Sequence, residues 1–155
     1  ANGSENYYIY YLFAPASGAN NIVLTSSASV NSCVQGISYT GASQTNTTEI
    51  TGSAIETNSA SPYTATVTTT ADNSWVVGRA RSSAAATVAS TGTTERVSCF
   101  SSFGDSNGGK TPAGAYSMAW TATAGNIFGQ VFSFAPSVEA ATLKSILGLV
   151  WAYFW

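Results

Sequence analysis

The sequence predicts an all-β protein: an antiparallel β-sandwich of Ig-like or jelly-roll type that ends in a hydrophobic helix or tail. Two observations predict the sandwich. Short runs of alternating apolar and polar residues recur about every ten residues, and turn signals separate them. Charged residues make up only 8% of the chain, while β-branched and aromatic residues are plentiful. A third observation predicts the tail, because a helical period begins only after Pro136.

The runs that predict strands are short and lie between Gly, Pro, Asn and Asp residues. They cover residues 6–13, 22–26, 30–40, 63–70, 74–81, 94–103, 115–123 and 126–135. The first run is apolar on both faces, which predicts a central strand covered on both sides. The runs 63–70 and 74–81 are predicted to form a hairpin, and 115–123 and 126–135 are predicted to form the last pair.

Two stretches lack a strand pattern. Residues 41–61 are mostly small or polar, apart from Ile50 and Ile55, and predict a long hydrated connection with room for one edge strand. Residues 104–112 are rich in Gly, Ser and Asn and predict a surface loop. Its oxygen-bearing side chains are of the kind that calcium prefers, but the spacing of an EF-hand and its final Glu are missing. A solvated loop is therefore favoured there.

Residues 137–155 are predicted to form a C-terminal hydrophobic assembly segment, separate from a β-sandwich domain at 1–136. Ser137 is placed as an N-cap, and Glu139 lies in the first turn, where the helix dipole favours an anion. Apolar residues then recur at three- and four-residue steps. Those predicted to form the assembly interface are Leu143, Ile146, Leu147, Val150, Trp151, Phe154 and Trp155.

Such an apolar end is unfavourable in water, so something is expected to cover it. A second copy, the chain's own domain and lipid all remain open, and the second copy is favoured. Lipid is disfavoured because Glu139 and Lys144 interrupt the segment and too few residues follow Lys144 to span a bilayer. The predicted partner is the protein itself, as a homo-oligomer or polymer.

Composition argues against several functional classes. The chain has no His, which excludes a Ser-His-Asp triad, a Cys-His dyad and most zinc sites. No pair among its acidic residues stands out as the two carboxylates of a glycosidase. We therefore predict no enzymatic activity, no cofactor and no metal. Five cationic residues and a net charge of −2 cannot supply the basic face that nucleic acid requires.

Two covalent features have open interpretations. Cys33 and Cys99 are predicted either to form a disulfide, which would stabilise the fold by about 4 kcal/mol, or to be two buried thiols. The disulfide is slightly favoured because the composition is that of a secreted protein. Asn46 begins an Asn-Thr-Thr sequence that matches the N-glycosylation pattern, although chance matches are expected in so Ser- and Thr-rich a chain.

Six aromatic residues at strand spacing also have two interpretations. They could stack on sugar rings, or they could fill the core between sheets, and the core is favoured. They are Tyr7, Tyr8, Tyr10, Tyr11, Tyr63 and Trp75.

Five strings occur in a familiar order: YYLFAPASG at 10–18, ISYTGASQT at 37–45, DNSWVV at 72–77, KTPAG at 110–114 and MAWT at 118–121. Through them, residues 7–136 resemble an uncharacterised β-sandwich module of Ig-like or jelly-roll type. That module occurs in secreted surface proteins of environmental bacteria, including candidate-phyla lineages, and in phage structural proteins. The resemblance implies no catalytic residues. It also implies that further strands precede the first string, so that a strand from another subunit would complete the sandwich.

We therefore expect a structural subunit of an extracellular filament, surface appendage or virion, which assembles through its C-terminal segment and by strand complementation. Its expected location is extracellular, at a cell surface or on a virion. One alternative is an adhesin module that binds glycans or a host surface through residues 41–70. Another is a surface protein that its tail anchors in a membrane.

Overall fold

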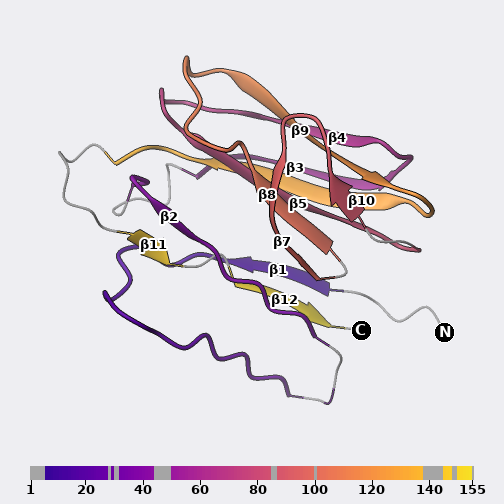
Figure 1. Ribbon diagram of the computed structural model, residues 1–155, viewed down its shortest axis with the longest axis horizontal. Coiled ribbons are helices and arrows are strands. Elements are labelled where there is room, and N and C mark those ends of the chain that lie inside the picture. Colours follow the sequence, from indigo (N-terminus) through magenta and orange to yellow (C-terminus); the bar gives the residue numbers. More distant parts are fainter. Residues whose placement is uncertain are drawn as a thin grey trace.

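The computed structural model describes residues 6–27, 29, 32–43, 50–84, 87–99, 101–137, 145–147 and 150–154. Over these residues the chain is all-β, its strands pair antiparallel, and it has no helix (Figure 1). The strands are β1 (Asn6–Tyr10), β2 (Ser38–Thr40), β3 (Ile50–Ser59), β4 (Tyr63–Thr68), β5 (Trp75–Ser82), β6 (Thr87–Ala89), β7 (Thr94–Cys99), β8 (Ser101–Asp105), β9 (Ala115–Ala122), β10 (Ile127–Phe134), β11 (Ser145–Leu147) and β12 (Val150–Phe154). Since none of these residues is helical, no described helix could cross a membrane.

The largest sheet has five strands in the order β3-β10-β5-β8-β7. Its centre is the ladder between β10 and β5, which runs without a break from Ile127 opposite Ser82 to Phe134 opposite Trp75. One edge strand, β3, falls in the stretch that the sequence predicted to be mostly connection with room for an edge strand. At the other edge, the run predicted as a single strand at 94–103 is instead the hairpin β7–β8.

A second sheet, in the order β4-β9-β6, covers one face of the five-stranded sheet. Its strand β4 alternates strictly between buried and exposed residues, as its sequence pattern requires. The buried residues of the two sheets form one core cluster: Tyr63, Ala65, Val67, Val76, Ala80, Met118, Trp120, Ile127 and Val131. Two packed layers thus bury a common apolar core, which is what stabilises such a fold in water.

Two glycines let the sheets approach closely. A Cβ at Gly129 of β10 would collide with the ring of Tyr63, and one at Gly78 of β5 would lie 2.8 Å from Cη2 of Trp120. Both aromatic side chains are fully buried. The largest residues of the β4–β9 layer therefore fit because the facing strands have glycine beneath them.

The structure does not contain the two strand pairs that the sequence predicted. β4 and β5 belong to different sheets, and so do β9 and β10. In each case the chain turns and crosses to the opposite layer instead of folding back within one sheet. The turn signal at Asp72 and Asn73 marks only the reversal, and it carries no information on which sheet receives the next strand.

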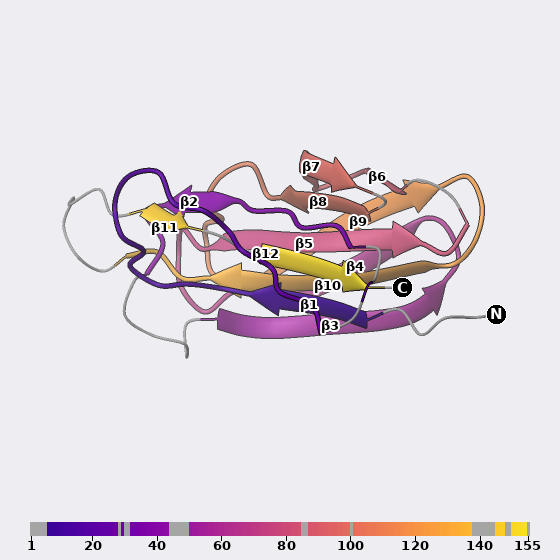
Figure 2. The same cartoon turned by 90° about the horizontal axis from the view of Figure 1, so that it is seen from below.

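A terminal layer covers the other face of the five-stranded sheet. It comprises β1, β2, β11, β12 and the described residues between 11 and 37. It lies below that sheet in Figure 1 and in front of it in Figure 2. A second core cluster joins the two: Tyr39 and Ala42 from the terminal side, and Val77, Phe103, Phe132 and Phe134 from the sheet. Ile9 and Ile37 pack against this cluster and are partly buried.

The tail has strands at Ser145–Leu147 and Val150–Phe154, where the sequence predicted a helix. β11 pairs with β2, and β12 pairs with β1. The physical reason lies in composition: β-branched and aromatic residues fit a pleated surface well, and Gly148 disfavours a continuous helix. Residues 138–144 of the predicted helix lie outside the described residues. The run at 22–26, predicted as a strand, has no strand pairing.

Candidate functional site: an aromatic surface on the terminal layer

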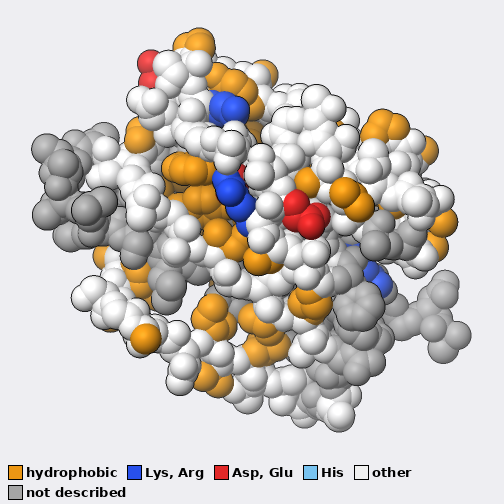
Figure 3. All heavy atoms as spheres, in the orientation of Figure 1, with side chains coloured by type: hydrophobic (Ala, Val, Ile, Leu, Met, Phe, Trp, Pro, Cys, Tyr) orange, Lys and Arg blue, Asp and Glu red, His pale blue; other side chains and the backbone are white. Residues whose placement is uncertain are grey.

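Exposed apolar side chains concentrate on the terminal layer. Tyr8, Tyr10, Tyr11 and Leu12 are between 44% and 55% exposed, and we refer to these four residues as the aromatic surface. Farther along the same layer, Val23 is 80% exposed. In Figure 3, apolar side chains are visible in the lower part of the molecule, where this layer lies, and also on the body. Single exposed apolar residues are ordinary, but several together typically mark an interaction surface.

Strand geometry explains why β1 serves both the core and the surface. Successive side chains of a strand point to opposite faces, so Ile9 packs inward while Tyr8 and Tyr10 face outward. The rings of Tyr8 and Tyr10 stack with their centroids 6.2 Å apart. Tyr11 meets Phe13 edge to face at 5.3 Å. The prediction that this run is a central strand covered on both sides is therefore wrong.

The core interpretation of the six aromatic residues holds for some of them only. Tyr63 is fully buried between the sheets, and Trp75 is half-buried beside the second cluster. Tyr8, Tyr10 and Tyr11 are exposed instead. The sequence could not separate the two groups, because both lie in runs of strand-forming residues.

The ladder between β1 and β12 is a sheet of two strands only. Its register runs from Asn6 opposite Phe154 to Tyr10 opposite Val150. No other described strand pairs with either one. Each strand therefore has one edge that no described strand covers, and such an edge is a template for pairing with another chain.

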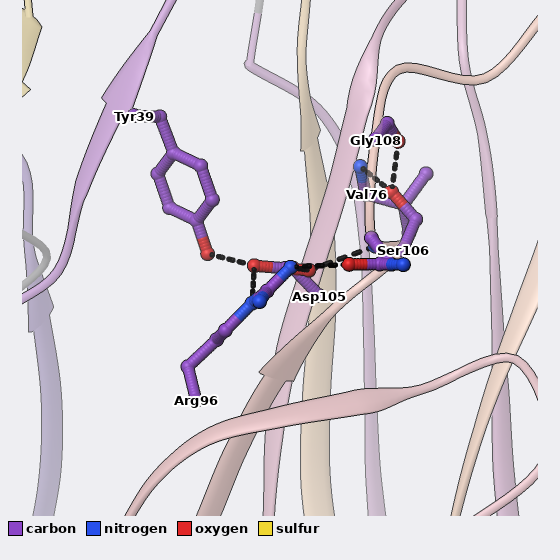
Figure 4. A network of polar contacts seen from close by, with 7 residues as sticks. Tyr39, Val76, Arg96, Asp105, Ser106 and Gly108 are labelled. Atoms are coloured by element: carbon purple, nitrogen blue, oxygen red, sulfur yellow. Dashed lines mark hydrogen bonds and ion pairs between the residues drawn. The ribbon is translucent and has the colours of Figure 1, made fainter.

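A buried polar network holds the terminal layer to the body (Figure 4). At its centre is Asp105, whose side chain is 2% exposed. Its Oδ2 accepts hydrogen bonds from the Tyr39 hydroxyl at 3.1 Å and from Nε of Arg96 at 2.7 Å. Its Oδ1 accepts from Nη2 of Arg96 at 2.8 Å and from the backbone N–H of Asn107 at 2.8 Å. The carboxylate is thus fully engaged by donors, which makes its burial tolerable.

Tyr39 is the member of this network that the terminal layer contributes. Its ring lies 5.1 Å from that of Trp75 and 6.1 Å from that of Phe134, measured between centroids. Burial, and then the negative charge of Asp105, raise the pKa of Tyr39 well above its ordinary value. The hydrogen bond to Asp105 raises the pKa of Arg96. The phenol therefore stays protonated and donates its proton to Asp105.

A disulfide provides a second link between the layer and the body. Cys33 of the terminal layer is joined to Cys99, the last residue of β7, with their Cα atoms 6.5 Å apart. This is the first of the two interpretations that the sequence left open. The link closes a long loop, which in the chain-entropy model stabilises the fold by about 4 kcal/mol.

The predicted assembly residues fall partly within the described tail. Ile146 and Leu147 belong to β11, and Val150, Trp151 and Phe154 belong to β12. Their strands pair with β1 and β2, so the structure brings the first two and the last two described strands together in one layer. Leu143, Trp155 and the glycosylation candidate Asn46 lie outside the described residues.

Sequence reasoning missed the network around Asp105. It placed Gly104 and Asp105 in a surface loop, whereas both end strand β8 and are buried. The sequence signal for this pair is weak. Arg96 and Asp105 lie nine residues apart, one in a predicted strand and the other in a predicted loop, and they meet because β7 and β8 form a hairpin.

This arrangement anchors one layer to another and leaves apolar side chains facing outward. Among the described residues, no three acidic or cysteine side chains come together as a metal site would require. Comparison with known proteins gives no match to a family model, to a curated protein or to a solved structure.

Proposed function

We propose that the chain is a structural subunit of an extracellular filament, surface appendage or virion, and that copies assemble through the terminal layer. The two packed sheets would be a β-sandwich of Ig-like or jelly-roll type, carried by residues 1–136. Residues 137–155 would be the assembly segment. The proposed role is not catalytic, and the partner is the protein itself. The disulfide suits an oxidising, extracellular location.

The aromatic surface is the observation that carries this proposal. Tyr10 is 53% exposed, and covering a tyrosine of that exposure buries on the order of 100 Å², which stabilises a contact by about 2–3 kcal/mol. Tyr8, Tyr11 and Leu12 are similarly exposed. Association costs about 4–15 kcal/mol in lost translational and rotational freedom. The free energy gained by covering all four side chains falls within that range.

The uncovered edges of β1 and β12 support the same proposal. A sheet of two strands is only marginally stable by itself. Added strands or a covering surface from another copy would stabilise it, and its apolar sequence suits such a contact.

The test compares the full chain with a chain that ends at Thr142. Light scattering after size exclusion gives the mass of each, and negative-stain electron microscopy shows whether filaments or particles form. We expect the full chain to assemble and the shortened chain to remain a folded monomer. Assembly of the shortened chain would contradict the proposal.

A pair of substitutions distinguishes assembly through the aromatic surface from non-specific apolar association. Tyr10→Ser should weaken assembly because it removes apolar area from the proposed contact. Val88→Ser is the matched control, since Val88 is 57% exposed on β6, in the opposite sheet. We expect that control to assemble as the unaltered chain does.

A second candidate function is glycan or host-surface binding, and exposed tyrosines favour it. Aromatic rings with an accessible face can stack against sugars, and Tyr8, Tyr10 and Tyr11 are the exposed rings of the terminal layer. Tyr63, in the polar stretch first considered for this role, is fully buried and cannot contact a ligand. Glycan-array binding that disappears with Tyr10→Ala while assembly persists would support the adhesin role.

A further inference from the structure

Building on the proposed function, we infer that copies assemble by exchanging their tails. β11 and β12 of one copy leave their own terminal layer and take the same places on the next copy, where β12 pairs with β1. The partner is a second copy of this chain, and the exchanged segment is 145–154.

The acceptor strands have their own attachments to the body. Ile9 of β1 packs against the second core cluster. Tyr39 of β2 is 4% exposed and donates its hydroxyl proton to Asp105 of β8. The segment between these strands is linked to β7 through the disulfide of Cys33. These attachments remain when the tail leaves, so β1 and β2 stay in position to receive another tail.

The donor segment is attached through backbone ladders. Its described contacts are the ladders of β11 with β2 and of β12 with β1. The buried residues of the two core clusters all precede Pro136. The body therefore keeps its described core when the tail is exchanged. Because every copy has the same sequence, a neighbour's β12 forms the same register on β1, and nothing new has to be recognised.

Residues 138–144 connect the fixed body to the exchanged segment. The backbone is fixed at Ser137, whose N–H donates to the carbonyl of Gly41 at 2.8 Å. From there, residues 138–144 span at most about 25 Å when extended. Two copies that exchange tails with each other would form a closed dimer, whereas a copy that passes its tail to a third copy makes a head-to-tail contact. Such contacts give rings when they close and filaments when they do not, which is the kind of assembly proposed above.

Cysteine cross-linking tests the exchange through the register of the ladder. Tyr7 lies opposite Tyr153, and opposite residues of an antiparallel pair are close enough for a disulfide. Neither residue belongs to the aromatic surface. Chains carrying Tyr7→Cys are mixed with chains carrying Tyr153→Cys, allowed to assemble and mildly oxidised. We expect covalent dimers of the two variants on a non-reducing gel. The control mixture of Val88→Cys with Tyr153→Cys should give none, because β6 is not the partner of β12.

A locked variant gives the second measurement. A single chain with both Tyr7→Cys and Tyr153→Cys, oxidised when dilute, holds its tail on its own β1. We expect this chain to lose assembly and to recover it after reduction, with the unaltered protein in the same reductant as the reference. If the unaltered chain never assembles, the proposed function fails. If it assembles, but the locked chain assembles equally and no interchain bond forms, only the exchange is overturned.

Discussion

Asp105 shows how a single charged side chain can belong to the core of a protein with few charges. Its two oxygens receive four hydrogen bonds, from Tyr39, Arg96 and Asn107. Arg96 is accessible on its outer side, with 36% of its side chain exposed. The pair therefore lies at the boundary of the core, where the guanidinium keeps contact with water. An ion pair of this kind fixes geometry more than it adds stability.

Removing the carboxylate should destabilise the fold. In Asp105→Ala, the buried Tyr39 hydroxyl loses its acceptor, while Arg96 can turn to solvent. We expect the free energy of unfolding to fall by about 2–3 kcal/mol, measured by urea denaturation. Glu95→Ala is the control, because Glu95 is exposed on the same strand as Arg96; it should change stability by less than about 0.5 kcal/mol. Equal effects of the two substitutions would show that the network does not hold the layers together.

The raised pKa of Tyr39 predicts a loss of stability at alkaline pH. Below the ordinary tyrosine pKa of 10.0, the phenol is protonated in both states and its contribution is complete. Above that pH, Tyr39 ionises in the unfolded chain but keeps its proton when folded. The unfolded state then binds fewer protons, so stability falls by about 1.4 kcal/mol per pH unit for this group. In Tyr39→Phe this part of the slope should disappear, as urea denaturation across the alkaline range will measure. Parallel curves for the two proteins would contradict the assignment.

At the residue scale, the sequence predicts a contact well when few residues of the required type are present. It named Cys33 and Cys99 as a candidate pair, since they are the only cysteines in the chain. It could not find the partners of Asp105, because a hydrogen bond between strands depends on register. Register is set by packing across the sheet, and a stretch rich in Gly, Ser and Asn looks the same whether it is buried or exposed.

At the scale of elements, the close approach of the two sheets rests on β10. Gly129 faces the ring of Tyr63, and neighbouring strands are tightly packed on both sides. Gly129→Ala should therefore force the Tyr63 ring out of position and lower the free energy of unfolding by about 1–3 kcal/mol. Gly114→Ala is the matched control, because a Cβ there meets nothing within 4 Å. Thermal denaturation of both variants checks the prediction, and a neutral Gly129→Ala would show that the sheets can separate easily.

The elements also show which kind of pattern is reliable. The runs at 63–70, 74–81, 115–123 and 126–135 each correspond to an observed strand. Among these four strands, buried and exposed residues alternate strictly only in β4, whereas β5 is buried along most of its length because it lies between two layers. Their partners were not predictable, since pairing depends on whether the chain crosses between layers. The tail was predicted as a helix because its apolar residues satisfy three- and four-residue spacing. Its described residues are strands, which fits their β-branched and aromatic character.

At the scale of the whole molecule, the two facing sheets form the body, and the terminal layer lies on one side of it. The two facing sheets bury Tyr63 and Trp120 completely. Strand β1 of the terminal layer buries one side and exposes the other, as Ile9 and Tyr10 show. The first and last described strands, β1 and β12, both lie in that layer. Assembly through the terminal layer would leave the two sheets of the body unchanged. Conditions that change assembly therefore need not change the stability of the fold.

Assembly through this surface should follow the conditions that govern apolar contacts. Only 8% of the residues are charged, so sodium chloride has few ion pairs to screen at the contact. Apolar association weakens on cooling and strengthens in sulfate. We therefore expect the sedimentable fraction to fall near freezing, to rise with ammonium sulfate and to change little with sodium chloride. Leu12→Ser should lower that fraction under every condition, because Leu12 is 55% exposed within the aromatic surface. Dissolution of the assemblies by moderate sodium chloride would mean that charged groups, and not the aromatic surface, hold the copies together.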